Sequence, residues 1–428
     1  MHMPQPTMTV TEAGKSGWLF KAAVRGSASR EKLSYPIACG IYSEIENDSA
    51  ILRFDLNGDI RQARGKGSSW PHPHEWLKRT RGNDWLYYST GGYTGVFEAI
   101  GEYYLPQFPY PTNSLLGGTP FTLPAVRRLI DSWPEIVALT CGQAGAMQAD
   151  ASALLEKIRL RTPAVHRQWA AEFARITGGR ISVLPPDARH VDYELLPLTI
   201  ARGCLYKCPF CRVKNPSVFE ELKDSEISEQ LHRMAVLYDK ELRNVNSIFL
   251  GEHDALAAQG NLLLSSARAA FQTLDQADCY MTGRNLFLFG SVTSLLAADC
   301  FAELAMLPGL TYINIGLESA DQETLDLLGK PVSAALVREA FSRMQQINRN
   351  YPNLEITANF VMADHLPEGH YRSILELIRD SLPRPQSKGS IYFSPLAFAQ
   401  PSRAKMFAFH RLKRLSRLPT YLYIIQRL

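Results

Sequence analysis

Three cysteines stand close together in the sequence at Cys204, Cys208 and Cys211, with the spacing C-x3-C-x2-C. Thiolates are the usual protein ligands of iron–sulfur clusters, and three on one short loop can hold three irons of a cubane cluster. A closed electron-transfer cluster needs a fourth cysteine, and none lies nearby in the chain. The spacing therefore predicts a 4Fe–4S cluster whose fourth iron is open to another ligand.

Two other interpretations of the triplet stay open. Structural zinc takes four Cys or His ligands, and His190 or His253 could supply the fourth only through the fold. Unrelated buried thiols are the third interpretation, because free cysteine often serves as a small core hydrophobe. In a reducing cytosol, a tight cysteine cluster more often binds metal or takes part in catalysis than forms disulfides.

The elements that must position the triplet alternate between strands and helices. Short apolar runs occupy residues 196–201, 247–251, 286–290, 311–316, 355–362 and 391–397, with longer helical stretches between them. This alternation predicts βαβ units and a parallel sheet, curled into an open barrel or doubly wound. The triplet directly follows the first run, at the sheet edge where parallel α/β proteins place their chemistry.

The cysteine triplet and two later segments resemble the radical S-adenosylmethionine (radical SAM) superfamily, in its bacterial oxidoreductase-like branch. The resemblance lies in the RGC start at 202–204, the aromatic Phe210 before the last cysteine, FLGEHDAL at 249–256 and GLES at 316–319. It covers about residues 185–400 and implies an α/β fold with a partial (βα)6 TIM-like barrel. It also implies that S-adenosylmethionine binds the open iron and is cleaved by one electron. The resulting 5′-deoxyadenosyl radical then abstracts hydrogen from a substrate.

The resemblance assigns further residues to the cofactor. Gly251 and Glu252 are expected to hold the methionyl amino group, because glycine allows close backbone approach and a carboxylate suits an amine. Next to them, His253 replaces a glycine of close relatives. Glu318 is expected to face the ribose or methionyl part, and Lys330 to pair with the methionyl carboxylate. The other implied contacts are Ser291 and Asn359 near the ribose, Val361 and Met362 along the adenine, and Phe210.

The reaction on the substrate stays open, because rearrangement, carbon–carbon bond formation, oxidation and methyl transfer can all start from the same radical. Two alternatives are a relative that transfers the aminocarboxypropyl group and a zinc-stabilised binding module. Cobalamin is not expected: SLLGG at 114–118 matches part of its pattern, but no Asp-x-His-x-x-Gly occurs. The four other cysteines are scattered, so no second cluster is predicted.

Residues 17–185 are predicted to form an aromatic-rich α+β region of unassigned function, after a disordered stretch over 1–16. Asn57-Gly58 between two apolar runs predicts a β-hairpin. Eleven aromatics between Trp70 and Tyr110 suit either a small core or a wall that faces the substrate. The pair His72 and His74 suits a metal or acid–base site, or, with prolines beside it, an extended surface loop.

The charge of the chain is unevenly spread. Its 428 residues carry a net charge of +4, and residues 402–428 contain basic side chains but no acid. The body is therefore mildly acidic, and nucleic acid is not an expected partner. The chain has no apolar run of about 18 residues and no secretory pattern at its start, which predicts a cytoplasmic protein.

Residues 401–428 are predicted to form a basic amphipathic helix. Its apolar positions at Met406, Phe409, Leu412, Leu415 and Leu418 recur at near-helical spacing. Such a helix either covers the barrel with a solvated basic face or contacts a membrane surface. The other expected partners are an unidentified substrate and an electron donor such as flavodoxin or ferredoxin.

Overall fold

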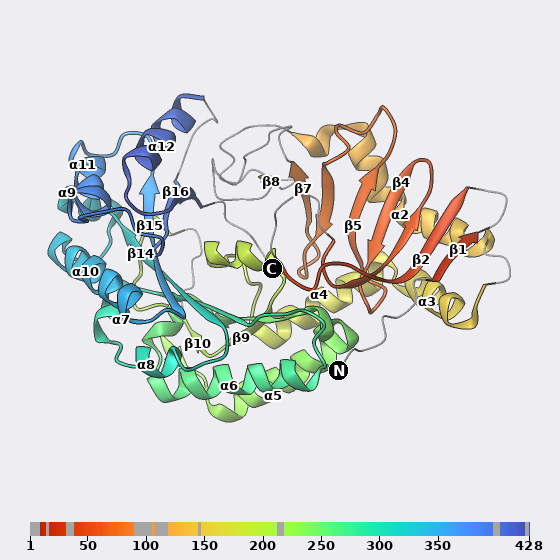
Figure 1. Cartoon of the computed structure of the whole chain (residues 1–428), viewed down its shortest axis with the longest axis horizontal. Helices are drawn as coiled ribbons and strands as arrows, with labels where there is room; N and C mark the ends of the chain where they lie inside the picture. Colours follow the sequence, from red (N-terminus) through yellow and green to blue (C-terminus); the bar gives the residue numbers. More distant parts are fainter. Residues whose placement is uncertain are drawn as a thin grey trace.

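The computed structural model describes residues 9–13, 17–30, 38–89, 105–107, 119–143, 147–211, 218–396, 403–423 and 428. Two large sheets divide them (Figure 1): an antiparallel sheet of eight strands in the N-terminal part and a parallel sheet of seven strands in the C-terminal part. The predicted fold class, an α/β partial barrel after an α+β region, is confirmed.

The parallel sheet has the strand order β17-β16-β15-β14-β13-β12-β9. Six of its strands coincide with the six predicted runs, and every residue of the first two is buried. Parallel strands covered on both faces carry such continuous apolar runs. The strands are β9 (Leu196–Thr199), β12 (Ser247–Gly251), β13 (Asn285–Gly290), β14 (Leu310–Glu318), β15 (Leu354–Met362), β16 (Ile391–Pro395) and β17 (Thr420–Leu422).

Helices between these strands pack along the outside of the sheet, as the βαβ pattern requires (Figure 1). The short helix η3 (Pro186–Val191) precedes β9, and β10 (Ala201–Arg202) pairs with β11 (Glu220–Glu221) just after it. The helices that follow are α5 (Asp224–Tyr238), η4 (Asp239–Asn244), η5 (Ala255–Ala257), α6 (Gly260–Gln276), α7 (Val292–Ala297), α8 (Phe301–Leu304), α9 (Gln322–Leu328), α10 (Ala334–Asn350), α11 (Gly369–Leu375), η6 (Glu376–Asp380) and α12 (Arg403–Leu415).

The antiparallel sheet is a meander in which each strand pairs with the next. Its first strand falls within residues 1–16, which were expected to be disordered. It is ordered because its backbone pairs with the second strand, from Thr9 opposite Ala22 to Ala13 opposite Trp18. The strands are β1 (Thr9–Ala13), β2 (Trp18–Arg25), β3 (Ile41–Glu46), β4 (Ala50–Phe54), β5 (Ile60–Gly65), β6 (Trp76–Arg79), β7 (Trp85–Ser89) and β8 (Leu105–Gln107).

Two hydrophobic cores divide the chain earlier than the expected boundary at residue 185. The short helix η2 (Pro120–Thr122) leads into α2 (Pro124–Gln143), which with α3 (Ala149–Leu160) shares a core with the antiparallel sheet. The next helix, α4 (Pro163–Thr177), instead contributes Phe173 and Ile176 to the core of the parallel sheet. The change of core therefore falls between α3 and α4.

The described aromatics of the N-terminal part favour the core interpretation. Trp70, Trp76, Tyr87 and Tyr88 are all buried. The remaining aromatics of this stretch, from Tyr93 to Tyr110, lie outside the described residues. The alternative of a wall facing the substrate concerns mainly that part of the chain.

The predicted hairpin is confirmed, and its turn joins the two halves. Gly58 has φ +81° between β4 and β5, which is the left-handed backbone that Asn-Gly favours. The side-chain amide of Asn57 donates to the Tyr238 carbonyl at 2.6 Å, and Leu56 N donates to Glu241 at 3.1 Å. The N-terminal sheet therefore contacts α5 and η4 of the barrel through a hydrogen-bonded turn.

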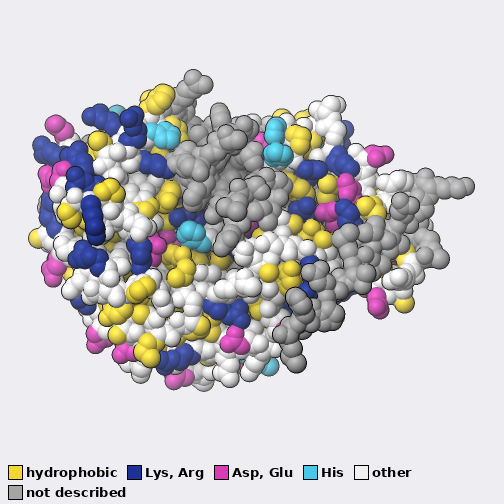
Figure 2. All heavy atoms as spheres, in the orientation of Figure 1, with side chains coloured by type: hydrophobic (Ala, Val, Ile, Leu, Met, Phe, Trp, Pro, Cys, Tyr) yellow, Lys and Arg dark blue, Asp and Glu magenta, His cyan; other side chains and the backbone are white. Residues whose placement is uncertain are grey.

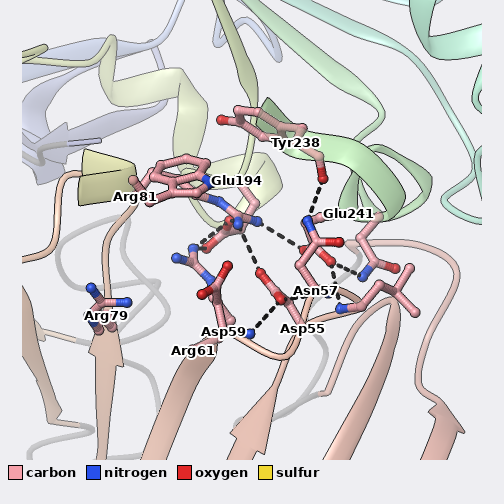
Figure 3. Close-up of polar contacts among 12 residues, drawn as sticks. Asp55, Asn57, Asp59, Arg61, Arg79, Arg81, Glu194, Tyr238 and Glu241 are labelled. Atoms are coloured by element: carbon pink, nitrogen blue, oxygen red, sulfur yellow. Dashed lines mark hydrogen bonds and ion pairs between the residues drawn. The ribbon is translucent and has the colours of Figure 1, made fainter. Parts of the chain in front are cut away.

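Arg81 lies buried among three carboxylates at this junction (Figure 3). Its guanidinium pairs with Glu241 at 2.9 Å, Asp55 at 3.0 Å and Glu194 at 3.4 Å. Arg61 bonds both oxygens of Glu194 at 2.7 and 2.9 Å. Burial alone would raise the pKa of Glu194, but the surrounding cations hold it well below its usual range. Each charge here depends on its partners, because little water remains to solvate it.

The C-terminal segment continues the parallel sheet. Residues 420–422 form β17 beside β16, so the expected division at residue 400 cuts through one sheet. Of the predicted apolar positions, Phe409, Leu412 and Leu418 are buried in the barrel core, which favours a helix that covers the barrel. Figure 2 shows Lys and Arg side chains gathered at the end of the molecule where α10, α11 and α12 lie. No helix in the described part of the chain is long and apolar enough to cross a bilayer.

Replacing Arg81 with alanine is expected to destabilise the junction strongly. Removing one partner of a buried ion-pair network leaves the others unpaired, which costs about 3–5 kcal/mol. Arg175→Ala is the control, because Arg175 pairs with Glu172 at 2.6 Å but its side chain is 63% exposed. An exposed pair contributes about 0–1 kcal/mol. Urea unfolding followed by circular dichroism measures the free energy of unfolding of both variants. Equal losses of stability in the two variants would contradict the claim that the junction depends on Arg81.

Candidate active site

The cysteine triplet lies on the loop that follows β10, at the carboxyl edge of the parallel sheet. Cys204, Cys208 and Cys211 are free thiols, each partly buried, and Cys211 N donates to the Cys208 carbonyl at 3.1 Å. Burial raises the pKa of Cys204 and raises that of Cys208 to about 11. Both groups therefore need a nearby cation before they become thiolates, and a bound metal supplies one.

The donor set fits an iron–sulfur cluster by its chemistry. Three thiols on one loop match the usual ligands of such clusters, which bind each thiolate to a separate iron. Among the described residues, no three His, Cys, Asp or Glu side chains gather as they would around a single ion. His190 stacks on Tyr312 with ring centroids 5.2 Å apart, and His253 lies 3.5 Å from Glu252. Among the described residues, neither histidine forms a zinc site with the three cysteines.

Two contacts from neighbouring loops hold the cysteine loop in place. The Tyr206 hydroxyl accepts from Thr293 N at 3.0 Å and lies 2.5 Å from the Thr293 hydroxyl. Thr293 is at the start of α7, so this contact fixes the loop to the third strand–helix unit. On another side, a Cβ at Gly329 would come within 2.9 Å of Pro209, and Gly329 has φ +64°. Glycine at position 329 therefore allows both the left-handed backbone and the close approach of Pro209.

Glu318 and Lys330, which the resemblance assigns to the cofactor, meet at the end of β14. Lys330 Nζ lies 3.5 Å from Glu318 Oε1 and 5.3 Å from the centre of the Tyr206 ring. Burial raises the pKa of Glu318, although the charge of Lys330 opposes the shift. A Cβ at Gly316 would come within 2.5 Å of the Glu318 carboxylate. Glycine at that position therefore makes room for the pair beside the cysteine loop.

Asp254 is a buried carboxylate that the sequence assignments left out. Its Oδ1 accepts from Ser291 N at 3.0 Å and from the Ser294 hydroxyl at 2.7 Å. Its Oδ2 is buried without a hydrogen-bond partner among the described residues. Burial raises the pKa of Asp254, and the charge of Lys330 acts against that shift. An unsatisfied buried oxygen of this kind indicates a place for a hydrogen-bond donor.

The structure gives the other predicted residues of β12 and β13 local partners. Ser291 caps α7, since its hydroxyl accepts from Ser294 N at 3.1 Å. Gly251 ends β12, and its carbonyl accepts from Ile200 N at 3.1 Å. The pKa of His253 is lowered mainly by burial, while Glu252 opposes the shift. Glu252 therefore faces its neighbouring histidine, whereas Asp254 faces the start of α7.

The predicted residues of β15 are buried along one strand. Asn359 exchanges hydrogen bonds with the side chain of Asn314 on β14. The carbonyls of Val361 and Met362 accept from the His370 ring at 2.9 Å and from Leu396 N at 2.8 Å. Phe210 lies partly buried on the cysteine loop. All of these residues therefore lie on or beside the strands of the parallel sheet.

Sequence reasoning missed three contributors to this edge of the sheet. Asp254 belongs to the segment 249–256 that resembles the superfamily. Its position as a carboxylate just after a buried strand could have identified it as a candidate site residue. Tyr206 and Asn314 gave no signal of their own, because their roles arise from partners 87 and 45 residues away. His72 and His74 lie with ring centroids 5.3 Å apart on a loop, and no described metal site includes them.

Comparison with known proteins finds likeness only in solved structures. Neither a protein-family model nor a curated protein matches the sequence. A radical SAM methyltransferase from Sphaerobacter thermophilus is 15% identical, with a TM-score of 0.37 over 53% of this chain and 64% of its own. The radical S-adenosylmethionine methyltransferase TsrM from Kitasatospora setae is 13% identical, with a TM-score of 0.33 over 47% of this chain and 36% of its own. This chain thus spans less than two thirds of either.

A third solved structure, the methylornithine synthase PylB, is 12% identical, with a TM-score of 0.34 over 68% of this chain and 77% of its own. The TsrM structure holds cobalamin and a 4Fe–4S cluster. For this chain, the absence of cobalamin stays a prediction. The first two neighbours are radical SAM enzymes, the superfamily that the motifs at 202–211, 249–256 and 316–319 resemble. Identity and superposition are low, so the chemistry of this chain is inferred from its own residues.

Proposed function

We propose that this protein is a radical SAM enzyme, in which Cys204, Cys208 and Cys211 hold a 4Fe–4S cluster. The observation that carries the proposal is the gathering of a three-thiol loop, the Glu318–Lys330 pair and Asp254 at one edge of a parallel sheet. When bound, such a cluster supplies the electron that divides S-adenosylmethionine into methionine and a 5′-deoxyadenosyl radical, which abstracts hydrogen from the substrate.

The charges at this edge suit the two charged groups of a methionyl moiety. Lys330 is a buried cation beside the cysteine loop, and a carboxylate is the group it attracts. Glu318 Oε1 lies 3.5 Å from the ammonium group of Lys330. A ligand carboxylate takes the place of part of this pairing, and Glu318 is then left to accept from hydroxyl or amino donors.

Asp254 is the better candidate for the methionyl amino group than Glu252. Both follow β12, but Asp254 is only 1% exposed and has one oxygen without a described hydrogen-bond partner. An ammonium group can donate to that oxygen in a charge-assisted bond. Glu252 instead faces His253 at 3.5 Å. The glycine before them keeps the role that the motif implies, because close approach at the strand end needs no side chain.

The partners and the reaction are proposed only as classes. A soluble one-electron donor in the cytoplasm is the expected reductant, and the substrate is unidentified. The C-terminal helix is proposed as a cover of the barrel, since Phe409 and Leu412 pack inward. Its outward face carries Arg411 and Arg414, both exposed, and that face suits an acidic surface.

Loss of one thiol is expected to abolish cluster binding. After anaerobic reconstitution, the natural chain should contain about four irons and release 5′-deoxyadenosine from S-adenosylmethionine with dithionite. Cys208→Ala should lose most of the iron and all of the deoxyadenosine, because one iron then lacks its ligand. Cys141→Ala is the matched control, since Cys141 lies on α2, in the other hydrophobic core.

Three results would contradict this assignment. A colourless protein that contains zinc and never yields deoxyadenosine would support the binding module. Methylthioadenosine in place of deoxyadenosine would support aminocarboxypropyl transfer. Equal iron in Cys208→Ala and Cys141→Ala would remove the triplet from the cluster.

Asp254→Asn is expected to weaken S-adenosylmethionine binding while iron content stays unchanged. Asparagine keeps an acceptor for the two serine donors but removes the negative charge, and a charge-assisted hydrogen bond contributes about 1.5–3 kcal/mol. Calorimetric titration without reductant should therefore show a dissociation constant raised about tenfold or more. Glu252→Gln is the comparison. If only Glu252→Gln weakens binding, the assignment of Asp254 is wrong and the one implied by the motif is right.

A further inference from the structure

The lumen of the barrel contains a polar layer that the motifs do not account for. The short helix η3 inserts Asp187 and Arg189 into it, and both side chains are almost fully buried. Three strands supply the other members: Asn314 from β14, Thr357 and Asn359 from β15, and Tyr392 from β16. Register places Thr357 beside Asn314, and Asn359 beside Tyr392, so neighbouring strands present these side chains together.

A continuous chain of hydrogen bonds runs from Asp187 to Asn359. The Thr357 hydroxyl donates to Asp187 Oδ2 at 2.8 Å, and the Asn314 amide donates to the Thr357 oxygen at 2.8 Å. The Asn359 amide donates to Asn314 Oδ1 at 2.6 Å, and Asn314 donates back to Asn359 Oδ1 at 3.3 Å. Every link joins buried side chains, so water competes little for these bonds.

The direction of this chain is fixed at its Asp187 end. Burial raises the pKa of Asp187 to about 6, against the charge of Arg189, so the carboxylate is ionised at pH 7 and above. An ionised carboxylate only accepts, so the single hydroxyl proton of Thr357 is used in the bond to Asp187. The Thr357 oxygen can then only accept from its other neighbour, which turns the NH2 group of Asn314 toward it. The Asn314 oxygen consequently faces Asn359. Asn359 is left with one N–H and one oxygen lone pair that its two bonds to Asn314 do not use.

A second arm holds Asp187 itself in place. The Tyr392 hydroxyl donates to Asp187 Oδ1 at 2.6 Å, and Arg189 lies 3.7 Å from the same oxygen. Arg189 also bonds the Tyr392 hydroxyl and stacks over the Tyr392 ring at 5.0 Å. The carboxylate therefore accepts hydrogen bonds on both oxygens, and one end of the chain cannot rotate without breaking them.

We propose that Asp187 is a positioning residue that sets the orientation of the Asn359 amide through Thr357 and Asn314. The inference rests on the proposed function and on the contact between Asn359 and the ribose of S-adenosylmethionine that the resemblance to the superfamily implies. A carboxamide presents a donor on one side and an acceptor on the other, so its orientation decides which ribose hydroxyl contact it can make. η3, which lies before the first barrel strand, thereby controls a residue on the fifth.

The test measures binding of S-adenosylhomocysteine to the full, cluster-loaded chain by calorimetry, without turnover. Thr357→Val removes the hydroxyl with little change in shape, and Thr357→Ser keeps it. The valine variant should raise the dissociation constant about fivefold, the effect of one misdirected neutral hydrogen bond, whereas the serine variant should stay within about twofold. Asp187→Asn, which can donate as well as accept, should match the valine variant.

Two further variants separate this inference from the proposed function. Asn359→Ala should weaken binding at least as much as Thr357→Val. Thr140→Val is the control for a lost buried hydroxyl, because Thr140 bonds the Ile136 carbonyl at 2.9 Å on α2. It should bind like the natural chain.

The outcomes distinguish the ribose contact of Asn359 from the positioning role of Asp187. If Asn359→Ala binds normally, the ribose contact that the resemblance implies is wrong, and the positioning role is wrong with it, whereas the proposed function is tested separately by the iron and deoxyadenosine of Cys208→Ala. If Asn359→Ala is weak but Thr357→Val and Asp187→Asn bind normally, the positioning role alone is overturned. If Thr357→Ser is as weak as Thr357→Val, keeping the hydroxyl does not preserve binding, so the shape of the side chain and not its hydrogen bond matters, which also overturns the positioning role.

Discussion

The shared direction of the barrel strands is the constraint on which the candidate site depends. Because all seven run parallel, the loops after β9, β12, β13 and β14 leave the sheet at one edge. Residues that are far apart in the chain, such as Tyr206 and Thr293 or Glu318 and Lys330, therefore come into contact there. An antiparallel sheet would send alternate loops to opposite edges. The N-terminal meander is built that way, and its described strand ends do not gather the motif residues.

The same edge carries polar groups that burial makes costly, and specific partners among the described residues offset that cost for all of these groups except Asp254 Oδ2. Asp254 caps the start of α7 through Ser291 and Ser294, so a carboxylate near the cysteines also fixes a helix. Lys330 sits against Glu318 and the Tyr206 ring. The groups proposed to hold the cofactor thus also hold the loops. Preorganisation of this kind lowers the ordering cost when a ligand binds.

Much of the barrel could be predicted from the sequence, and the reason is local. Each of the six apolar runs that became strands is short and buried on both faces, a pattern that adjacent residues already display. The triplet, Glu318 and Lys330 could be proposed as site residues from the sequence because their motifs are contiguous or nearly so. β1 was missed because Thr9–Ala13 is polar, and its order depends on pairing with β2. The pairing of Asp254 with α7 was missed for a similar reason, since it joins two strand–helix units.

The hardest feature to predict was the role of the segment between the two cores. Residues 186–194 looked like a lead-in to the first strand, yet they join two buried polar networks. Asp187 bonds Thr357 in the lumen, whereas Glu194, seven residues later, is held by Arg61 and Arg81 at the junction with the N-terminal sheet. Both ends of this short segment are therefore fixed by charged groups that cannot be released into an apolar interior without a large cost. The eight residues from Asp187 to Glu194 therefore connect the polar layer of the lumen to the junction with the N-terminal sheet.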